Sequence, residues 1–384
     1  MTPTNRRILV VGAGFAGAVH ARTLAENGYR VHVIDRRPHI GGNAYDRVDE
    51  NGIRVHVYGP HLFHTKNEAV IAWLKRFGRF TPYQHKVRVR LPDGATAPLP
   101  INRTTVNIVH GTDLQTEAEV KAFLASVAVP IAHPANAAEY LYSRIGTALT
   151  DLFFRPYTRK MWLMELEDMA ASVVQRIPIN YDDTDTYFER TQTQMMPVDG
   201  YTALFDQILS HEAITVDLGV GYEKGMERDY GHCFTSMPID EYFDYVDGEL
   251  PYRSIRFHHR TATEAPEQGW SVTNFTDDGP LTRETAWHII PHHLVERTGR
   301  YTYTAEEPCD YKDNGFERYY PVKTADGRFQ ARYDLYKERA KDLATISFIG
   351  RCGTYQYLDM DQVINQSLAH VGKWIAERSG QGAA

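Results

Sequence analysis

The chain has 384 residues, of which 42% are hydrophobic and 24% are charged, a composition typical of a globular protein with room for two or three domains. The net charge of −7 and the pI near 6.2 offer no general attraction to nucleic acids or anionic membranes, so an anionic ligand has to be held by individual arginines and helix ends. We expect no membrane insertion and no secretory signal, and the 3 widely spaced cysteines favour free thiols in a reducing cytoplasm.

The first forty residues predict a dinucleotide-binding unit made of strand, glycine-rich turn, helix and second strand. An apolar run at residues 8–11 leads directly into the turn, and the second apolar run ends in an acidic residue. Glycines permit the tight turn and the close approach of a pyrophosphate, the helix N-terminus attracts phosphate, and the acid accepts hydrogen bonds from a ribose hydroxyl. The predicted cofactor contacts are Gly12, Gly14, Phe15, Gly17 and Asp35.

A second glycine-rich turn directly after the acid favours FAD as the cofactor. This turn contains Arg36, Arg37, Gly42 and Asn43. Its pattern RxxxGGN resembles the glutathione-reductase-like flavoproteins, in which the same turn lies along the FAD pyrophosphate. The alternatives are an ordinary Rossmann domain that binds NAD and a Rossmann domain that has lost its nucleotide.

A strand and a histidine-containing loop come next. Residues 53–57 alternate between apolar and polar, which predicts a strand, and the loop at residues 58–65 carries His61 and His64. No third ligand with suitable spacing follows, so we interpret the segment as a loop against a ligand and not as a metal site. Residues 87–91 also alternate and run into Pro-Asp-Gly at 92–94, which predicts a hairpin.

The period then changes to that of helices. Helical spacing over residues 120–127 and 141–152, with Asn136 as an N-cap, predicts a small inserted helical domain. The aromatic and cationic stretch at residues 151–162 is either a buried helix end or a platform on which a flat ring stacks. The acidic, poorly periodic segment 165–185 carries Arg176 and is a candidate mobile lid.

The second half predicts strands around one more helix. A helix follows Gly200, and a strand at residues 214–218 ends in Gly-Val-Gly. Too few residues precede the strand at 233–235 for a second dinucleotide unit, so we expect no separate NADPH domain. Alternating runs at residues 252–257, 270–275, 285–290 and 301–304 predict an antiparallel sheet. A last strand at residues 346–349 leads to a helix that Asp359 can cap, with its N-terminus toward the cleft.

Six motifs together resemble the bacterial UDP-galactopyranose mutase family, in order and nearly from end to end. They are GAGFAGA, RRPHIGGNAYD, GPHLFHT, PIDEYFDYVDGELPYRSIRF, YYPV and GRCGTYQYLDMDQ. The resemblance implies an α/β fold with a discontinuous Rossmann-like FAD domain (1–80, 196–243 and 322–384). It also implies a small helical insertion domain (103–152) and an antiparallel β-sheet domain with a mobile loop (81–102, 153–195 and 244–321).

The same resemblance implies the candidate site residues. Arg176 on the mobile loop and Arg283 on the sheet match arginines that grip the substrate diphosphate, and His64 lies in the loop near the flavin N5 atom. Uracil is expected to stack at Phe153 and Tyr157. The candidate substrate-binding residues are Phe153, Tyr157, Thr158, Trp162, Tyr187, Asn274, Tyr320, Tyr357 and Asp359. The cofactor-binding residues that the resemblance adds are His61, Arg351, Asp359 and Met360.

The implied activity is an isomerisation between UDP-galactopyranose and UDP-galactofuranose. Reduced FAD attacks C1 of galactose through N5, a covalent flavin–sugar adduct forms, and UDP leaves as an anion that planar guanidinium groups stabilise. The implied protein is a cytoplasmic homo-oligomer without nucleic-acid partners. Two alternatives share the FAD pattern, namely an FAD-dependent amine or amino-acid oxidase and a non-enzymatic binding protein like GDP-dissociation inhibitor.

Overall fold

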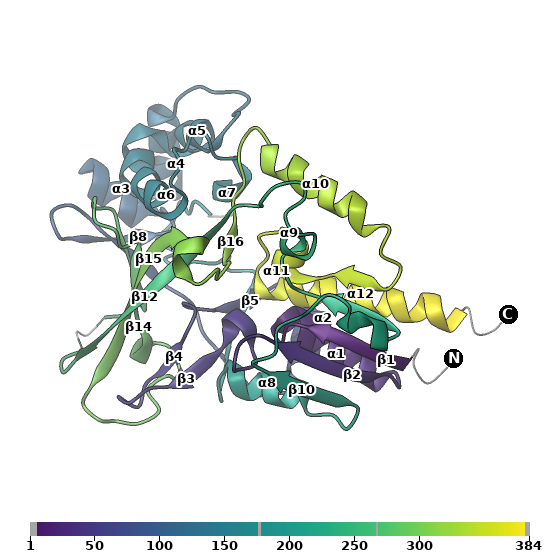
Figure 1. Ribbon diagram of the computed structural model, residues 1–384. Coiled ribbons are helices and arrows are strands. Elements are labelled where there is room, and N and C mark those ends of the chain that lie inside the picture. The colour runs from purple at the N-terminus through teal and green to yellow at the C-terminus, as the bar shows by residue number, and fades with distance from the viewer. Residues whose placement is uncertain (1–5, 176–177, 266–267, 381–384) are drawn as a thin grey trace.

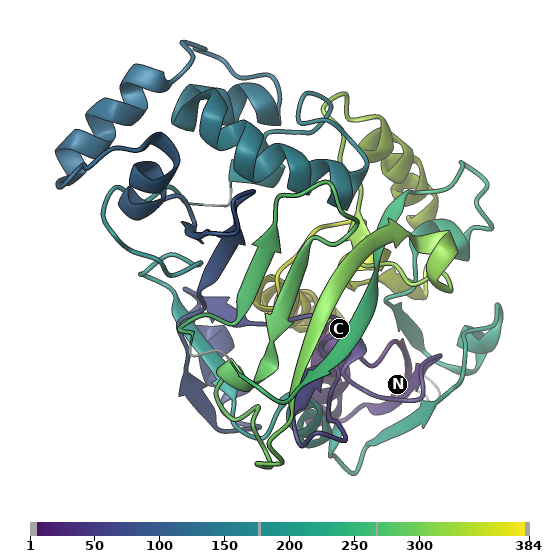
Figure 2. The same cartoon turned by 90° about the vertical axis from the view of Figure 1, so that its left-hand side faces the viewer.

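The computed structural model describes residues 6–175, 178–265 and 268–380 and has an α/β fold. Figure 1 shows a group of helices, α3 to α7, at one end of the molecule, and the N- and C-termini at the other end. The quarter-turn view in Figure 2 shows the long strands of a second sheet below these helices. A five-stranded sheet, described next, and the helices that cover it lie on the side of the termini (Figure 1).

A five-stranded sheet forms the unit predicted from the first motif. All of its strand pairs are parallel. Residues on both faces of its central strand are buried, as expected for a parallel sheet covered by helices on both sides. In spatial order the strands are β10 (Ile214–Leu218), β2 (Arg30–Asp35), β1 (Arg7–Val11), β11 (His232–Thr235) and β17 (Ile346–Phe348).

Helices with small and aliphatic residues pack against this sheet in one hydrophobic core. Helix α1 begins at the glycine-rich turn and is buried along most of its length. The helices around it are α1 (Phe15–Glu26), α2 (Glu68–Leu74), α8 (Tyr201–Leu209) and α12 (Met360–Gly380). Between β10 and β11 only the short 3-10 turn η4 (Met226–Asp229) intervenes, which confirms that Gly219 and Gly221 do not begin a second dinucleotide unit.

A seven-stranded sheet lies beside the five-stranded parallel sheet. Its strand pairs are antiparallel except β13 and β7, which are parallel. In spatial order the strands are β16 (Tyr320–Pro321), β12 (Tyr252–Ala262), β15 (Tyr301–Asp310), β14 (Arg283–Ala286), β13 (Val272–Phe275), β7 (Val87–Arg90) and β8 (Thr96–Leu99). The hairpin predicted from residues 87–94 is confirmed by the pairing of β7 with β8.

The helical group packs on β7 and β8 through a second hydrophobic core. Its members are α3 (Arg103–His110), α4 (Glu117–Val127), α5 (Ala137–Leu149), the π-helical turn η3 (Thr150–Phe154), α6 (Arg155–Trp162) and α7 (Ser172–Gln175). The predicted N-cap is confirmed, because the Asn136 side chain accepts a hydrogen bond from the Glu139 N–H at 2.9 Å. Gly146 kinks α5 at a φ of 73°, where a Cβ would lie 2.6 Å from the Val127 carbonyl oxygen.

The remaining elements are two small sheets and three helices, of which α10 (Arg328–Ala340) is the longest. Two small antiparallel sheets contain β3 (Asp46–Val48) with β4 (Arg54–His56), and β5 (Phe63–Thr65) with β9 (Thr193–Pro197) and β6 (Phe80–Pro82). Three further helices are α9 (Ile239–Tyr242), α10 (Arg328–Ala340) and α11 (Gly350–Gly353). Among the described helices, none has the length and apolar character needed to cross a membrane.

Two expectations about local structure are wrong in detail. The run at residues 285–290 is not one strand, because β14 ends at Ala286 and the 3-10 turn η5 (Trp287–Ile289) follows, burying Trp287 completely. The expected cap at Asp359 is formed by its backbone alone: its carbonyl accepts from the Val363 N–H at 3.0 Å and its N–H donates to Gln362 Oε1 at 2.9 Å, whereas no hydrogen bond among the described residues joins its carboxylate to the first turn of α12.

Candidate active site

One cavity of about 560 Å³ collects every predicted site residue that the structure describes. It runs from the glycine-rich turn of α1, past the loop after β4, to the seven-stranded sheet and α6. Its walls therefore come from segments that lie far apart in the sequence. Arg176 is outside the described residues.

The glycines at the N-terminus of α1 leave no room for side chains. A Cβ on Gly17 would lie 1.9 Å from the carbonyl oxygen of Gly12, and Gly12 itself has a φ of 106°. A Cβ on Gly42 would lie 2.9 Å from the Cα of Gly14, so the two predicted glycine turns touch. Helix α1 has no side-chain cap at Gly14, which leaves its first N–H groups for an anionic ligand.

Asp35 holds this turn in place at the end of β2. One carboxylate oxygen accepts from the Ala13 N–H at 2.7 Å, and the other accepts from the Arg37 N–H at 2.9 Å. Each carboxylate oxygen has a second lone pair, and Asp35 lines the cavity. The geometry thus leaves acceptors for ribose hydroxyls.

The arginine next to the predicted one makes the closer contacts here. Arg36 lines the cavity but is 48% exposed. Arg37 donates to Asn43 Oδ1 at 2.9 Å, forms an ion pair with Glu317 and lies over the Tyr58 ring. Arg37 belongs to the second glycine-rich turn, but the sequence predicts only Arg36 as a cofactor contact, because two consecutive arginines carry no sign of which one is buried.

The other end of the cofactor cradle is formed by the histidine loop and the start of α12. His61 donates from Nδ1 to the Gly59 carbonyl at 2.8 Å, and burial lowers its pKa to about 4, so the ring is neutral. His64 contacts Gln192 Oε1 at 3.1 Å through Nδ1, and its Nε2 lies 3.9 Å from the Asp359 carboxylate. Met360 follows at the first position of α12 and also lines the cavity.

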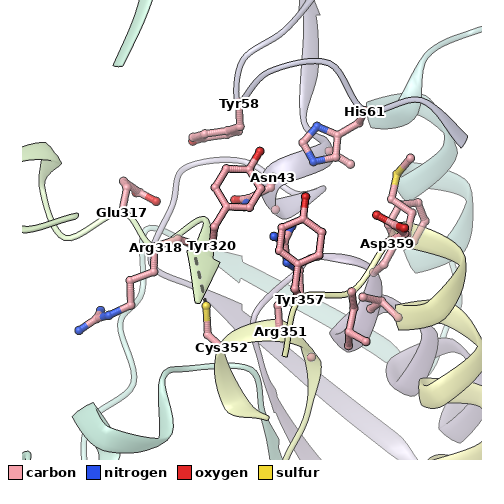
Figure 3. A pocket seen from close by; sticks show the side chains of 18 of the residues that line it. Asn43, Tyr58, His61, Glu317, Arg318, Tyr320, Arg351, Cys352, Tyr357 and Asp359 are labelled. Atoms are coloured by element: carbon pink, nitrogen blue, oxygen red, sulfur yellow. Dashed lines mark hydrogen bonds between the residues drawn. The ribbon is translucent and has the colours of Figure 1, made fainter. Parts of the chain in front are cut away.

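Two stacked tyrosines face this loop. Tyr320 and Tyr357 stack with centroids 5.5 Å apart, and Figure 3 shows their hydroxyl groups pointing toward the loop that carries Tyr58 and His61. Arg351 lies behind both rings, at 5.3 Å and 5.2 Å from their centroids. Its Nε is buried without a hydrogen-bond partner in the described part of the chain.

Arg283 is the cationic centre of the cavity. Its Nε lies 2.9 Å from the carboxylate of the buried Glu306, although the N–H is not aligned for a hydrogen bond. Burial opposes the charge on Arg283, but Glu306 outweighs that effect and raises the pKa of the guanidinium, which stays charged. Since Glu306 faces only one side of the guanidinium, its remaining N–H groups are available to an anion in the cavity.

Asn274 stands directly across from Arg283. The two are register partners in the β13–β14 pair, and the Oδ1 atom of Asn274 is buried without a hydrogen-bond partner among the described residues. A buried polar atom that lacks a partner costs free energy, so this one, like Arg351 Nε, indicates a place for a polar ligand.

Aromatic residues from η3 and α6 line the far end. The π-helical turn and α6 place Phe153, Tyr157 and Thr158 along one wall, and Trp162 at the end of α6 lies edge-on to Tyr320 with centroids 6.2 Å apart. Burial raises the pKa of Tyr157 to about 12, so its hydroxyl keeps its proton. Tyr187 lines the same region and lies edge-on to His85. The stretch at residues 151–162 is therefore part of the cavity wall.

Sequence reasoning missed two further cavity or support residues, namely His85 and Glu306. Glu306 and Arg283 are register partners in the pair of β14 with β15. A pattern of alternating residues could have placed the two on facing strands only if the register had been known. His85 carries no signal in its own segment, because it precedes the strand that contains the alternation.

The cradle fits FAD. Glycines that a Cβ would disrupt lie at the helix N-terminus, Asp35 offers acceptors for a ribose, and the cavity continues past His61 and the start of α12, which leaves room for more than a mononucleotide.

Comparison with known proteins gives the same assignment. Residues 152–357 match the family described as UDP-galactopyranose mutase, and residues 10–77 match the NAD(P)-binding Rossmann-like domain. The chain is 37% identical to the dTDP-fucopyranose mutase of Escherichia coli over 94% of this chain and 96% of that protein. It is 35% identical to the probable UDP-galactopyranose mutase of Klebsiella pneumoniae over 98% and 97%.

A solved structure agrees on the fold. The crystal structure of reduced UDP-galactopyranose mutase superposes with a TM-score of 0.75 at 17% identity and covers 97% of this chain and 96% of that chain. Taken with the family match and the full-length relatives, the chain belongs to the UDP-galactopyranose mutase family, a family of FAD-dependent isomerases.

Proposed function

We propose that this protein interconverts UDP-galactopyranose and UDP-galactofuranose. The observation that carries the proposal is the buried Arg283, which lies in one cavity with the cofactor cradle and the aromatic wall of α6. An amine oxidase has no use for a diphosphate-binding arginine beside an aromatic wall. The full-length relatives likewise favour a mutase over the oxidase and over a non-enzymatic binding protein.

The reaction breaks the C1–O bond to the diphosphate, opens the six-membered ring, closes the five-membered ring through O4 and restores the bond to UDP. No electrons are consumed overall. Reduced FAD supplies a nucleophilic N5 atom for C1. The protein's task is therefore to hold the sugar nucleotide, stabilise the departing diphosphate and keep bulk water away from C1.

We assign the diphosphate to Arg283 and Arg176. The guanidinium of Arg283 is charged at all working pH values and is aimed by Glu306, and a planar guanidinium binds phosphate oxygens in pairs. Tyr320 adds a donor, since burial raises the pKa of its hydroxyl and keeps it protonated. We assign Tyr187 and Tyr357 to the same phosphates.

We assign the uracil to the wall formed by Phe153 and Tyr157, with Thr158 and Trp162 at its edge. A flat base stacks on such rings with about 1–3 kcal/mol per base. Asn274 is placed to accept a hydrogen bond from the nucleotide or the sugar through its unpartnered Oδ1. His64 and Asp359 lie beside the flavin end of the cavity.

The test is an assay of the purified holoprotein with UDP-galactofuranose, before and after reduction with dithionite. We expect turnover only in the reduced state, because only reduced FAD supplies a nucleophile. Equal activity of oxidised and reduced protein would contradict the proposed chemistry, and absence of activity in both states on either sugar nucleotide would remove the proposed function.

A second substrate has to be assayed in parallel. The 37% identical relative from Escherichia coli is a dTDP-fucopyranose mutase. The cavity wall near Phe153 also contains Val87, Leu99 and Val174, an apolar setting compatible with the additional methyl group of thymine. A higher kcat/KM for dTDP-fucopyranose than for UDP-galactopyranose would assign the chain to that reaction.

We further propose that the protein is a homo-oligomer located in the cytoplasm. Light scattering after size-exclusion chromatography measures the oligomeric state directly, and a single species of monomer mass would contradict the first part.

A further inference from the structure

Two buried histidines lie behind the histidine loop, residues 58–65. His56 ends β4, and His293 lies in the connection between β14 and β15, and their exposed fractions are 0% and 1%. Their Nε2 atoms lie 3.0 Å apart. The backbone N–H of His61 donates to His56 Nδ1 at 2.9 Å. Since His61 lines the cavity, the two rings are connected to the cofactor cradle through the backbone of the loop.

The hydrogen bonds determine the tautomer of each ring. His293 Nδ1 lies 2.9 Å from the carbonyl oxygen of Pro291, and since a carbonyl can only accept, the proton of His293 is on Nδ1 and its Nε2 has a lone pair. His56 Nδ1 accepts from the loop, so the proton of His56 is on Nε2. His56 therefore donates to His293. Three hydrogen bonds run in one direction, from the His61 N–H to the Pro291 carbonyl, and bonds in such a chain strengthen one another.

This arrangement requires both rings to be neutral. Burial is the main cause that lowers the pKa of His293 to about 4 and the pKa of His56 well below its usual value, and the nearby Arg54 acts in the same direction on both. A second proton on either ring would occupy a nitrogen that accepts a hydrogen bond. The neutral pair therefore keeps the chain of bonds intact.

The surroundings of the pair connect it to the strand that carries Arg283. Trp287 follows β14 directly, stacks on His293 with centroids 6.2 Å apart and an interplanar angle of 6°, and lies 5.0 Å from the His56 ring. The Arg54 N–H donates to the His293 carbonyl at 2.7 Å, which joins this connection to β4. A continuous set of contacts thus runs from β14 to the histidine loop.

We propose that His56 and His293 are positioning residues that hold the histidine loop at a fixed place relative to β14, and so set the separation between the cofactor cradle and Arg283. The proposed reaction needs C1 of the sugar to meet the flavin while the diphosphate stays on Arg283. A misplacement of about 1 Å can cost roughly 10²-fold in rate. The catalytic part of this inference rests on the proposed function, whereas the part that concerns the loop and the retention of FAD does not.

Two substitutions at His293 separate positioning from packing. In His293→Gln the side-chain oxygen reaches about as far as Nε2 and can accept from His56, whereas the leucine of His293→Leu is of similar size and has no acceptor. Within the described residues, His293 is the only acceptor for Nε2 of His56. The leucine variant therefore leaves a buried N–H unpartnered, and the His56 ring can satisfy it only by giving up the bond with His61.

We expect His293→Leu to release FAD about tenfold faster than wild type and to lose about tenfold in kcat, with KM changed by less than about twofold. His293→Gln should stay within about threefold of wild type in both quantities. The increase in flavin fluorescence after dilution of the holoprotein measures FAD release. Deuterium exchange of peptides covering residues 57–65 measures the loop itself, and exchange should be faster in His293→Leu only.

Equal FAD release and equal exchange in the two variants, whether altered or unaltered, would overturn the proposal. If His293→Leu does not fold, deuterium exchange of the wild-type holoprotein decides. The amide of His61, resolved with overlapping peptides, should then exchange at least about 10²-fold more slowly than in an unfolded peptide. Fast exchange at this amide would overturn the proposal as well.

His232 is the matched control, because it is a buried histidine at the other end of the parallel sheet. It begins β11 opposite Ile8 and bonds Ser347 Oγ at 2.9 Å. His232→Leu should lower Tm and leave FAD release and kcat unchanged; effects equal to those of His293→Leu would show a general loss of stability and overturn the assignment.

The outcomes for the function and for this inference are distinguishable. Wild-type protein that is inactive on both sugar nucleotides would remove the proposed function, and FAD release and loop exchange would still judge the inference. Active wild type with a His293→Leu variant that matches it in FAD release, loop exchange and kcat would remove only the inference.

Discussion

At the scale of single residues, the ion pair between Arg283 and Glu306 keeps a charged guanidinium in the cavity, where it is available to an anion. Glu306 is 2% exposed, and burial raises the pKa of its carboxyl, an effect that Arg283 partly offsets. The pair fixes the guanidinium before a substrate arrives. Preorganisation of this kind is more effective in a water-poor site than in solvent.

Replacing Arg283 should therefore abolish turnover without loss of the cofactor. We expect Arg283→Ala to lower kcat by about 10²–10³, the usual cost of removing a donor that stabilises developing negative charge, and Arg283→Lys to recover little because a lysine binds only at one point. Steady-state kinetics and flavin absorbance measure both effects. Arg260, which pairs with Glu284 on the exposed part of the same sheet, is the control.

The aromatic wall can be tested at Trp162. Its ring lies edge-on to Tyr320 at the end of α6, so Trp162→Ala should weaken UDP binding about tenfold through lost stacking area while FAD remains bound. Calorimetric titration of UDP into the yellow holoprotein gives the answer. An unaltered UDP affinity would take Trp162 out of the binding site.

Some residues of the site could be predicted from the sequence, and others could not. Arg283, Tyr320 and Asn274 were placed by resemblance, and the structure brings them into one cavity, yet their individual roles stay predictions. The burial of Arg37 and the pairing of Glu306 with Arg283 could not be predicted, because burial and strand register arise only when distant segments meet.

At the scale of elements, the glycine-rich turn before α1 leaves the least room for side chains. Gly17→Ala would bring a Cβ to 1.9 Å from the Gly12 carbonyl oxygen, a backbone atom that cannot move without opening the turn. We expect this variant to be purified with most of its FAD missing, as measured by the ratio of absorbance at 450 and 280 nm, roughly the flavin and protein maxima.

The control is another helical glycine. A Cβ on Gly372 in α12 would have no neighbour within 4 Å among the described residues outside its own helical turns, so Gly372→Ala should keep its FAD and gain up to about 1 kcal/mol of helix stability. Equal FAD content in Gly17→Ala and Gly372→Ala would show that the turn tolerates a side chain.

Periodic elements were predictable and irregular ones were not. The helical spacing at residues 120–127 and 141–152 predicts α4 and α5, and Asn136 predicts the N-cap of α5. The π-helical turn Thr150–Phe154 and the 3-10 turn Trp287–Ile289 could not be predicted, since apolar residues in both continue the regular period of the preceding element. The parallel pair of β7 and β13 joins segments that are far apart, and no local pattern encodes that direction.

At the scale of the whole molecule, the buried histidines lower the free energy of unfolding at low pH. Burial lowers the pKa to about 3 or 4 for five of them: His20, His61, His85, His232 and His293. In the unfolded chain these groups bind protons near pH 6.5, while the folded protein does not. The free energy of unfolding therefore falls as pH drops below about 6.5, by up to about 1.4 kcal/mol per pH unit for each group.

We accordingly expect Tm to fall steeply between about pH 7 and pH 5. Differential scanning fluorimetry of the holoprotein at constant ionic strength measures the slope. A Tm that stays constant or rises over this range would show that the buried rings take up protons in the folded state.

The division into an FAD domain, a helical domain and a β-sheet domain with the boundaries given above stays a prediction, although the α/β fold itself is confirmed. Composition and the first motif were sufficient for the parallel sheet. They could not show that one continuous cavity would join it to the seven-stranded sheet, because that depends on how β7, β13 and β14 are oriented toward α12.

The order of strands in the parallel sheet also bears on how the protein is made. β1 and β2 leave the ribosome first, but β11 and β17, which complete the sheet on one side of β1, begin at His232 and Ile346. The nucleotide turn is therefore made long before the strands that pair with β1 and β11 on that side of the sheet. Until β11 has been made, one edge of β1 stays unpaired, and an unpaired strand edge is a site at which incompletely folded chains associate.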